Sequence, residues 1–195
     1  TPAGPVACRV RHEAGRSASA TIRNVPAFSV RLDAAIEVPG LGRVPFDLAY
    51  GGHFYAMVPA GAVGLALEPA EASRIIAAGE RIRARIEAEV PLVHPEMPDA
   101  RGLLYIQFFE PARRADARLR NAVVVAPAGL DRSPCGTGTS ARLANLHARG
   151  TLAVGEPFGH ESIIGTLFTG CIAGETQVGG MPAVLAQVQR VAKDA

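Results

Sequence analysis

The strongest constraint on the fold is a pattern of alternating apolar and polar residues, divided into short pieces by turn residues, in the first third of the chain. β-Branched residues on alternate positions predict strands. These expected strands occupy residues 6–10, 18–22, 28–38, 44–50 and 54–58. The segments between several of them, at 13–16, 24–26 and 39–42, are rich in glycine, proline and asparagine. Because short turns join antiparallel neighbours, we predict antiparallel sheet and not a doubly wound parallel sheet.

Two helices interrupt this pattern. Apolar residues recur at helical spacing between residues 68 and 90, where Pro69 suits a first turn and Pro91 ends the helix. A second helix is expected at 140–149, because Gly150 follows in a position where helices commonly end. Further strands are expected at 103–109, 122–126 and 163–172, with an exposed loop at 110–121. Strands outnumber helices, so the expected class is α+β.

Composition excludes several classes of protein. The 195 residues are 48% hydrophobic and 19% charged, enough to bury a core and too apolar for a disordered chain. The 20 basic and 18 acidic residues nearly balance, which argues against a nucleic-acid or membrane-surface binder. No apolar run reaches the ~18–20 residues of a membrane span, and the first residues lack the apolar core of a signal peptide.

The reactive side chains narrow the chemistry further. The one lysine, Lys193, lies near the C-terminal end, so neither a pyridoxal phosphate Schiff base nor a P-loop is expected. The three cysteines are Cys8, Cys135 and Cys171. An odd, sparse count argues against a disulfide framework and for a reducing compartment, so we expect a cytoplasmic protein. No pair of cysteines or histidines has zinc-ligand spacing, and no metal is expected.

One segment concentrates residues suited to chemistry, residues 131–142 with the sequence DRSPCGTGTSAR. Glycines free its backbone to bend, and Cys135 is expected just before a helix N-terminus. There, unpaired amides and the helix dipole lower the pKa of a thiol and attract a carboxylate. A thiol and an anion site built from one turn suit a cysteine that acts as acid and base on an α-amino acid.

Three other interpretations compete for this segment. Residues 136–141 match a permissive dinucleotide fingerprint, but the preceding strand is expected to end near Ala126 and no βαβ unit surrounds them. A cysteine hydrolase would pair Cys135 with a histidine, for which the sequence offers no orienting partner. A buried cysteine that only caps the helix is the plain alternative. The dense polar and glycine-rich flanks favour the acid–base interpretation.

These residues also carry a family resemblance. Residues 131–141 closely resemble the signature around the second catalytic cysteine of the proline racemase family, which includes 4-hydroxyproline 2-epimerases. Further segments resemble family landmarks in family order, so the resemblance covers most of the chain. They are residues 24–28, 50–56, 94–96, 155–158 and 161–166.

The resemblance implies a diaminopimelate-epimerase-like fold, in which two pseudo-symmetric α+β domains face each other across a cleft and each wraps an antiparallel sheet around a central helix. This chain is then mostly one domain: residues 1–25 are a remnant of the first and residues 26–195 form the second. The resemblance also implies a homodimer. A missing N-terminal half, on the same or a separate chain, is expected as a partner.

The implied reaction is racemisation or epimerisation of proline or 4-hydroxyproline without a cofactor. One cysteine takes the α-proton as thiolate, and another returns a proton from the opposite face. By position, Cys135 matches one base, and Asp131 matches the carboxylate that meets the ring ammonium of the imino acid. Gly136 and Thr137 match residues whose backbone amides hold the substrate carboxylate.

The sequence departs from the family in three places. The other family cysteine belongs to a Cys-Gly-His motif upstream of the first residues here, and neither Cys8 nor Cys171 has such neighbours. Residues 187–195 do not resemble the closing strands of the family. His53 stands where many members carry asparagine, so the choice between proline and 4-hydroxyproline stays open.

Two alternative functions follow. A trans-3-hydroxyproline dehydratase would resemble residues 50–56, but such relatives typically lack a cysteine at the position of Cys135. A catalytically inactive half, acting as a binding module, would explain the absence of the second motif. By itself, the chain is expected to be inactive.

Overall fold

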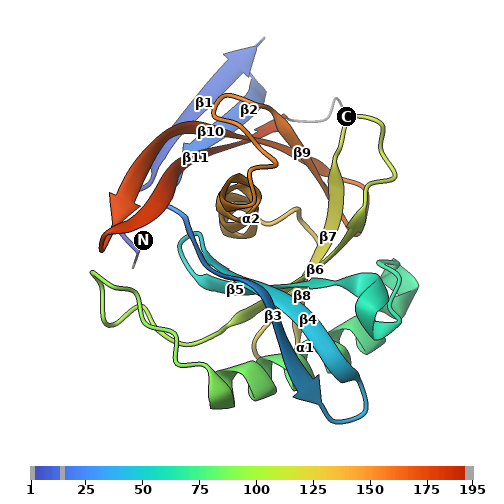
Figure 1. The fold of residues 1–195 in the computed structure, drawn as a ribbon. Coiled ribbons are helices and arrows are strands. Elements are labelled where there is room, and N and C mark those ends of the chain that lie inside the picture. The colour runs from blue at the N-terminus through green and yellow to red at the C-terminus, as the bar shows by residue number, and fades with distance from the viewer. Residues whose placement is uncertain (1–2, 14–15, 192–195) are drawn as a thin grey trace.

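A single mixed sheet curves around one helix in the computed structural model, which describes residues 3–13 and 16–191 (Figure 1). The fold is α+β, as predicted. The helical segments are η1 (Ala60–Val63), η2 (Pro69–Glu71), α1 (Ala72–Glu89) and α2 (Gly136–Ala148). The strands are β1 (Ala7–Glu13), β2 (Arg16–Arg23), β3 (Phe28–Val38), β4 (Gly42–Tyr50), β5 (Phe54–Pro59), β6 (Tyr105–Pro111), β7 (Leu119–Val125), β8 (Gly129–Asp131), β9 (Phe158–Ser162), β10 (Leu167–Val178) and β11 (Met181–Val191).

The sheet order within the described residues is β1-β2-β11-β10-β9-β7-β6-β5-β4-β3, with β8 paired to β7. Most neighbours are antiparallel, as the short turns predict. Two pairs, β5 with β6 and β7 with β9, are parallel, and the sequence pattern did not indicate them. Both parallel pairs are joined by long connections that contain a helix, α1 in one case and α2 in the other, as parallel neighbours require.

The segment just before β3, at one end of the sheet order, meets β11 through backbone hydrogen bonds between Ala27 and Val184, and the β1–β2 hairpin lies beyond this closure. The sheet therefore surrounds α2, which runs through its interior (Figure 1). Every residue of α2 from Gly138 to Leu146 is buried. Gly51 permits the close approach of sheet and helix, since a Cβ there would lie 2.4 Å from the carbonyl oxygen of Thr137.

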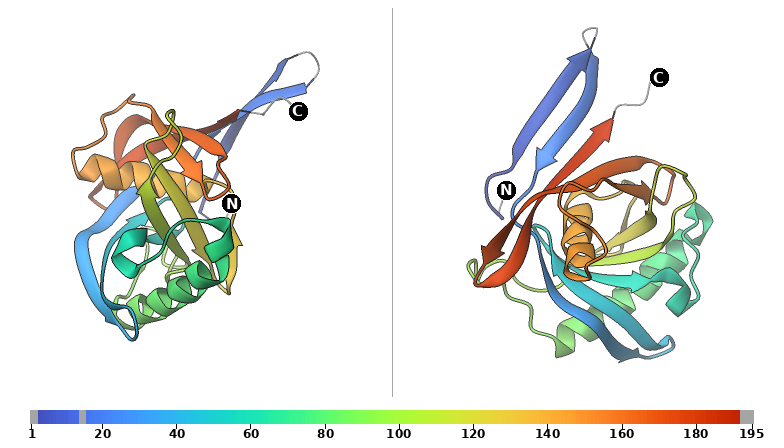
Figure 2. Two further views of the ribbon diagram at one scale, coloured as in Figure 1. Left: turned by 90° about the vertical axis from the view of Figure 1, so that its right-hand side faces the viewer. Right: turned by 45° about the horizontal axis from the view of Figure 1, so that its top comes forward.

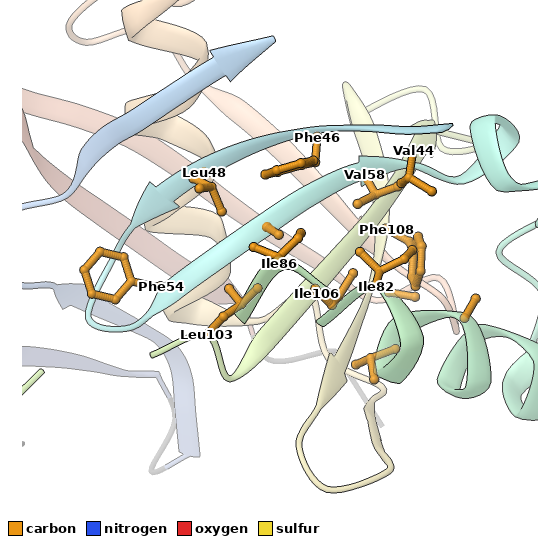
Figure 3. Packing of buried hydrophobic residues seen from close by; sticks show 14 of the residues in the cluster. Val44, Phe46, Leu48, Phe54, Val58, Ile82, Ile86, Leu103, Ile106 and Phe108 are labelled. Atoms are coloured by element: carbon orange, nitrogen blue, oxygen red, sulfur yellow. The ribbon is translucent and has the colours of Figure 1, made fainter. Parts of the chain in front are cut away.

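Helix α1 lies outside the ring and covers the outer face of the sheet (Figure 1). Its apolar side packs into the largest core cluster, where Ile82 and Ile86 meet residues of β4, β5 and β6 (Figure 3). The opposite side carries arginine–glutamate pairs, such as Arg83 with Glu80 and Glu87. This is the amphipathic helix that the spacing predicts. None of the helices in the described part of the chain is long and apolar enough to cross a bilayer.

The β1–β2 hairpin projects from the rest of the molecule (Figure 2). Strand β2 pairs with β11, so the hairpin continues the same sheet, while the described residues of β1 pair with β2 alone. The turn expected at 13–16 includes Ala14 and Gly15, which lie outside the described residues, as does Lys193. The division between residues 1–25 and 26–195 stays a prediction.

Several element boundaries differ from the sequence prediction. Helix α2 begins at Gly136, not at residue 140, because its first hydrogen bond runs from the Thr139 amide to the Cys135 carbonyl. The strand expected at 163–172 begins at Leu167, since Gly165 forms a turn after β9. The loop expected at 110–121 is shorter, because β7 already begins at Leu119. Residues 181–191, whose last part was expected to depart from the family, form strand β11.

Candidate active site

A cavity of about 490 Å³ opens beside the first turn of α2. Its walls come from the first turn of α2, from β5, β6 and β8, and from the apolar side chains of Ile22 and Val188 on the neighbouring part of the sheet. All four site residues expected from the sequence line this cavity. They are Asp131, Cys135, Gly136 and Thr137. The structure therefore brings together the residues that the linear motif singles out.

Cys135 is the N-cap residue of α2 and has a left-handed backbone, with φ of 62°. A non-glycine residue in this region is strained and requires support from its surroundings. The Cys135 amide donates to the Ser133 hydroxyl at 3.0 Å. One residue earlier, the Pro134 carbonyl accepts from the Thr139 hydroxyl at 3.2 Å, and Thr139 in turn contacts His160 Nδ1 at 2.9 Å. These bonds hold the thiol at the cavity edge.

The thiol is nearly buried, with 8% of the residue exposed. Its Sγ lies 3.4 Å from the Tyr55 hydroxyl and 3.9 Å from the Thr137 hydroxyl. Tyr55 and Thr137 are themselves 2.5 Å apart, oxygen to oxygen. The partners of Cys135 among the described side chains are thus two hydroxyls, and while they stay bonded to each other one of them can donate its proton to a thiolate. This arrangement differs from the cysteine–histidine pair that a hydrolase would need.

The expected lowering of the thiol pKa is wrong. Burial raises the pKa of Cys135 above its ordinary value, because a thiolate loses hydration in this site. Hydrogen bonds from Tyr55, from the Gly138 amide and from Thr137 oppose that effect, and the negative charge of Asp131 adds to it. The helix N-terminus alone does not decide the protonation of a cysteine that is also desolvated.

Asp131 ends β8 and lines the cavity while half-buried. Its carboxylate accepts from the Ser133 amide at 2.8 Å and from the Ser133 hydroxyl at 3.0 Å. These local bonds hold the turn before Cys135, as a capping role would require. Each carboxylate oxygen keeps a further lone pair for a ligand. The pairing of Asp131 with a ring ammonium stays a prediction.

Gly136 and Thr137 form the first turn of α2. Amides in the first turn of a helix lack acceptors within the helix, and the helix dipole gives that end a partial positive charge. An anion such as a carboxylate is therefore favoured beside these two residues. The predicted contact with a substrate carboxylate rests on this general property.

Other cavity residues were not assigned a role from the sequence, although Asn24 and Tyr55 lie in segments that resemble family landmarks. Asn24 donates to the Gly51 carbonyl at 2.7 Å and to the Ser140 hydroxyl at 3.0 Å, and so ties the sheet to α2. Tyr55 reaches Cys135 from β5. No local spacing could signal these contacts, since each joins segments far apart in the chain.

Of the histidines, His53 lines the cavity, where its ring lies 5.1 Å from that of Tyr105. Burial lowers its pKa, so His53 is neutral near pH 7. His94 is occupied elsewhere, because its Nδ1 accepts from the amides of Glu96 and Met97. His147 binds the Leu152 carbonyl and Glu175.

The other two cysteines lie away from this cavity. Cys8 is exposed on β1, and Cys171 is half-buried on β10. Both border a different groove on the β1, β2, β10 and β11 side of the molecule. Within the described residues, no three histidine, cysteine, aspartate or glutamate side chains gather closely enough to hold a metal ion.

Comparison with known proteins identifies the family. The family model described as "Proline racemase" matches residues 1–193. This chain belongs to the proline racemase family. The 4-hydroxyproline 2-epimerase of Streptosporangium roseum is 48% identical over 186 residues, which cover 95% of this chain and 55% of that protein. The proline racemase of Clostridioides difficile is 37% identical over 187 residues, or 96% of this chain and 56% of that protein.

Solved structures agree with the family assignment. A hydroxyproline epimerase from Agrobacterium vitis with bound trans-4-OH-L-proline matches with a TM-score of 0.92 and 39% identity. The match covers 97% of this chain and 54% of that one. A methylitaconate-delta-isomerase, at 11% identity and a TM-score of 0.59, shares the fold alone. The chain therefore spans about half the length of the proline racemase family members that it matches.

Proposed function

We propose that this chain supplies one of two proton-transferring thiols in a cofactor-independent racemase or epimerase of proline or 4-hydroxyproline. Cys135 is that thiol. The single observation that carries the proposal is its placement, nearly buried at the edge of a cavity and at the N-terminus of α2. Family membership and the relatives named for these substrates support it.

The proposed step moves one proton. The Cα–H bond of the imino acid breaks, its proton goes to the Cys135 thiolate, and the electron pair is delocalised into the substrate carboxylate. Amides of Gly136 and Thr137, at the positive end of α2, are suited to stabilise the charge that develops on those carboxylate oxygens. A second thiol on the opposite face then forms the new Cα–H bond.

Asp131 is proposed to bind the ring ammonium of the substrate. Its carboxylate lines the same cavity as Cys135, and within residues 3–13 and 16–191 its hydrogen bonds come from Ser133 alone. A charge-assisted contact of this kind contributes roughly 1.5–3 kcal/mol. The ammonium would also offset the negative charge that Asp131 places near the thiol.

The raised pKa of Cys135 fits one direction of the reaction. Burial favours the neutral thiol, which is the form that returns a proton to the carbanion. In the other direction the thiolate is needed, and the hydroxyls of Tyr55 and Thr137 are placed to stabilise it.

The opposing thiol is proposed to lie outside these 195 residues, in the part of the family length that this chain does not span. A two-base inversion needs a proton carrier within about 3–3.5 Å of Cα on each face. Cys8 and Cys171 border another groove, so neither is placed for that role. We expect the 195 residues alone to interconvert no enantiomers.

The test follows α-deuterium incorporation from D₂O into L-proline and trans-4-hydroxy-L-proline by NMR. It uses this chain alone and combined with the missing family half. Cys135→Ser should reduce exchange by the combined protein at least about a thousandfold, since it removes a proton carrier. Cys171→Ser, a matched change away from the cavity, should leave exchange unchanged.

Near-normal exchange by Cys135→Ser would refute the assignment of the base. Steady-state racemisation by material with the mass of the 195 residues would refute the proposed need for a second half. Formation of a dehydrated product from trans-3-hydroxyproline, without exchange into proline, would identify a dehydratase. Tight binding without any turnover by the combined protein would identify a binding module.

A further inference from the structure

A fully buried glutamine lies close to Cys135. Gln107, on β6, has no exposed surface. Its carbonyl oxygen Oε1 accepts from Arg142 Nε at 3.1 Å. A guanidinium has donors and no acceptor, so the carbonyl must face Arg142 and the amide nitrogen must point the other way. The orientation of this side-chain amide is therefore fixed by chemistry.

Arg142 is itself held firmly. It is 2% exposed, and its guanidinium carbon lies 4.0 Å from the centre of the Phe109 ring. Its Nη1 donates to Asn145 Oδ1 at 3.2 Å, and Asn145 Nδ2 donates to Asp47 at 2.9 Å. Burial lowers the pKa of Arg142 to about 9, which leaves it charged near neutral pH. A rigid, charged donor thus anchors Gln107.

The amide nitrogen of Gln107 has no hydrogen-bond partner among the described residues. A buried N–H without an acceptor is costly, which makes this nitrogen conspicuous. It also borders the same small space as the reactive sulfur. A Cβ placed on Gly138 would lie 2.9 Å from Gln107 Nε2 and 3.1 Å from Cys135 Sγ. Tyr55 Cε1, 3.2 Å from the same point, borders this space as well, and Gln107 Nε2 and Cys135 Sγ are not hydrogen-bonded to each other in the structure.

We propose that Gln107 is a positioning residue for Cys135, whose amide N–H, oriented by Arg142, donates to the sulfur when the thiol becomes a thiolate. The inference rests on the proposed function, in which Cys135 acts as the base. On ionisation the S–H bond breaks, the proton passes to water, and the sulfur becomes an acceptor for the waiting N–H. The free-energy cost of the unpaired Gln107 N–H is then present while Cys135 is a neutral thiol and is removed when it becomes a thiolate.

The titratable groups that line the cavity together with Cys135 are His53, Tyr55, Tyr105 and Asp131. Tyr55 on β5 and Tyr105 on β6 have pKa values raised chiefly by burial, so both stay neutral as the thiol ionises. His53 is neutral because burial lowers its pKa. Asp131 opposes the thiolate by its charge. The thiolate is therefore stabilised in this site by fixed N–H and O–H donors, and Gln107 supplies a further N–H donor.

The experiment measures ionisation of the thiol directly and needs no substrate. Alkylation of the intact chain by iodoacetamide is followed against pH, and peptide mass mapping separates Cys135 from the exposed Cys8, which serves as internal reference. In Gln107→Met, which keeps the length and removes the donor, the apparent pKa of Cys135 should rise by about one unit. The alkylation rate at a fixed pH below that pKa should fall about tenfold. Gln177→Met, at an exposed position on β10, is the matched control and should change nothing.

A second variant covers the case in which methionine disturbs the core. Gln107→Glu keeps the shape, can pair with Arg142, and places negative charge beside the sulfur, so the thiol pKa should rise further than in Gln107→Met. An unchanged alkylation profile in Gln107→Glu overturns the proposal, whatever its melting temperature. Failure of both variants to fold would assign Gln107 to the core alone and overturn it as well.

The proposed function and this inference fail in different ways. If Cys135→Ser keeps α-proton exchange while Gln107→Met shifts the alkylation profile, the glutamine–thiolate contact stands and the base is another residue. If Cys135→Ser abolishes exchange while both Gln107 variants keep the wild-type profile, the base stands and the contact is refuted.

Discussion

The two α-helices of this chain differ in how much of their surface is buried. Helix α1 buries one face and leaves the other to water, where Arg83 pairs with Glu80 and Glu87. Helix α2 is buried on nearly every side, and its interior polar residues bind partners on other elements and on α2 itself, while Arg142 Nη2 has no partner among the described residues. Arg142 binds Gln107, and Asn145 binds Asp47.

The difference between the two helices shows how the cost of a polar side chain depends on its burial. The ion pairs on α1 can be broken at little cost in free energy, because their charged side chains are solvated whether or not they pair. The buried polar side chains of α2 need hydrogen-bond partners within the protein, because burying a polar group without one costs free energy. The network on α2 begins beside Cys135 and ends at the ion pair of Arg149 with Asp47. The buried polar residues of α2 thus belong to one network that joins the helix to β4 and β6.

The largest test of this comparison concerns close approach. Gly51→Ala places a Cβ against backbone atoms of Thr137 and Ala141, which cannot move without shifting α2. We expect a loss of about 3 kcal/mol or more in the free energy of unfolding, measured by urea denaturation. Gly79→Ala on α1 meets only the Val124 side chain and should cost less, about 1–2 kcal/mol. Gly61→Ala, which has open space, is the control. Equal losses at positions 51 and 79 would contradict the distinction.

The second test compares ion pairs. Asp47 is 7% exposed and accepts from Arg149, Asn145 and the Asp33 amide. Asp47→Ala leaves those donors without an acceptor and should cost about 2–3 kcal/mol of unfolding free energy. Arg83→Ala on α1 should cost less than about 1 kcal/mol and should lose even that in 1 M salt. The comparison would be contradicted if Asp47→Ala lost as little unfolding free energy as Arg83→Ala and if that loss disappeared in 1 M salt. The buried network would then contribute no more than a surface ion pair.

The smallest expected effect is on acid stability. His160 is buried against Thr139 of α2, and burial lowers its pKa well below its ordinary value. The unfolded chain therefore binds a proton below about pH 6.5 that the folded chain does not, and stability falls as the pH drops through that range. His160→Gln should reduce the fall in melting temperature between pH 7 and 5. The exposed His12→Gln is the control, and an unchanged fall in His160→Gln would exclude this residue as a source of acid lability.

The sequence was a good guide to α1 and a poorer one to α2, for a physical reason. One apolar face gives α1 a clear helical period that ends before Pro91, although the predicted start at Pro69 belongs to η2 and α1 itself begins at Ala72. Helix α2 is buried all round, and its glycine-rich first turn has low helical propensity, so its start at Gly136 was missed. The parallel pairing of β7 with β9 was missed as well, because the residues of a strand do not by themselves specify which strand pairs with it.

The candidate site was predicted in part. The motif correctly placed Asp131, Cys135, Gly136 and Thr137 together, since they are neighbours in the chain. Contacts such as Tyr55 with Cys135 come from strands far away and have no local signal. The thiol pKa was predicted in the wrong direction, because burial depends on the whole fold and a short motif does not encode it.

The pairing of β2 with β11 has a consequence for how the chain is made. Ile22 of β2 lies opposite Val188 of β11, so the first strands emerge from the ribosome long before their partner is synthesised. Until then β2 presents an open edge, a template for pairing with other nascent chains. Contacts of such long sequence separation also form slowly once the chain is complete. We expect the yield of folded protein to depend on chaperones that shield this edge during translation.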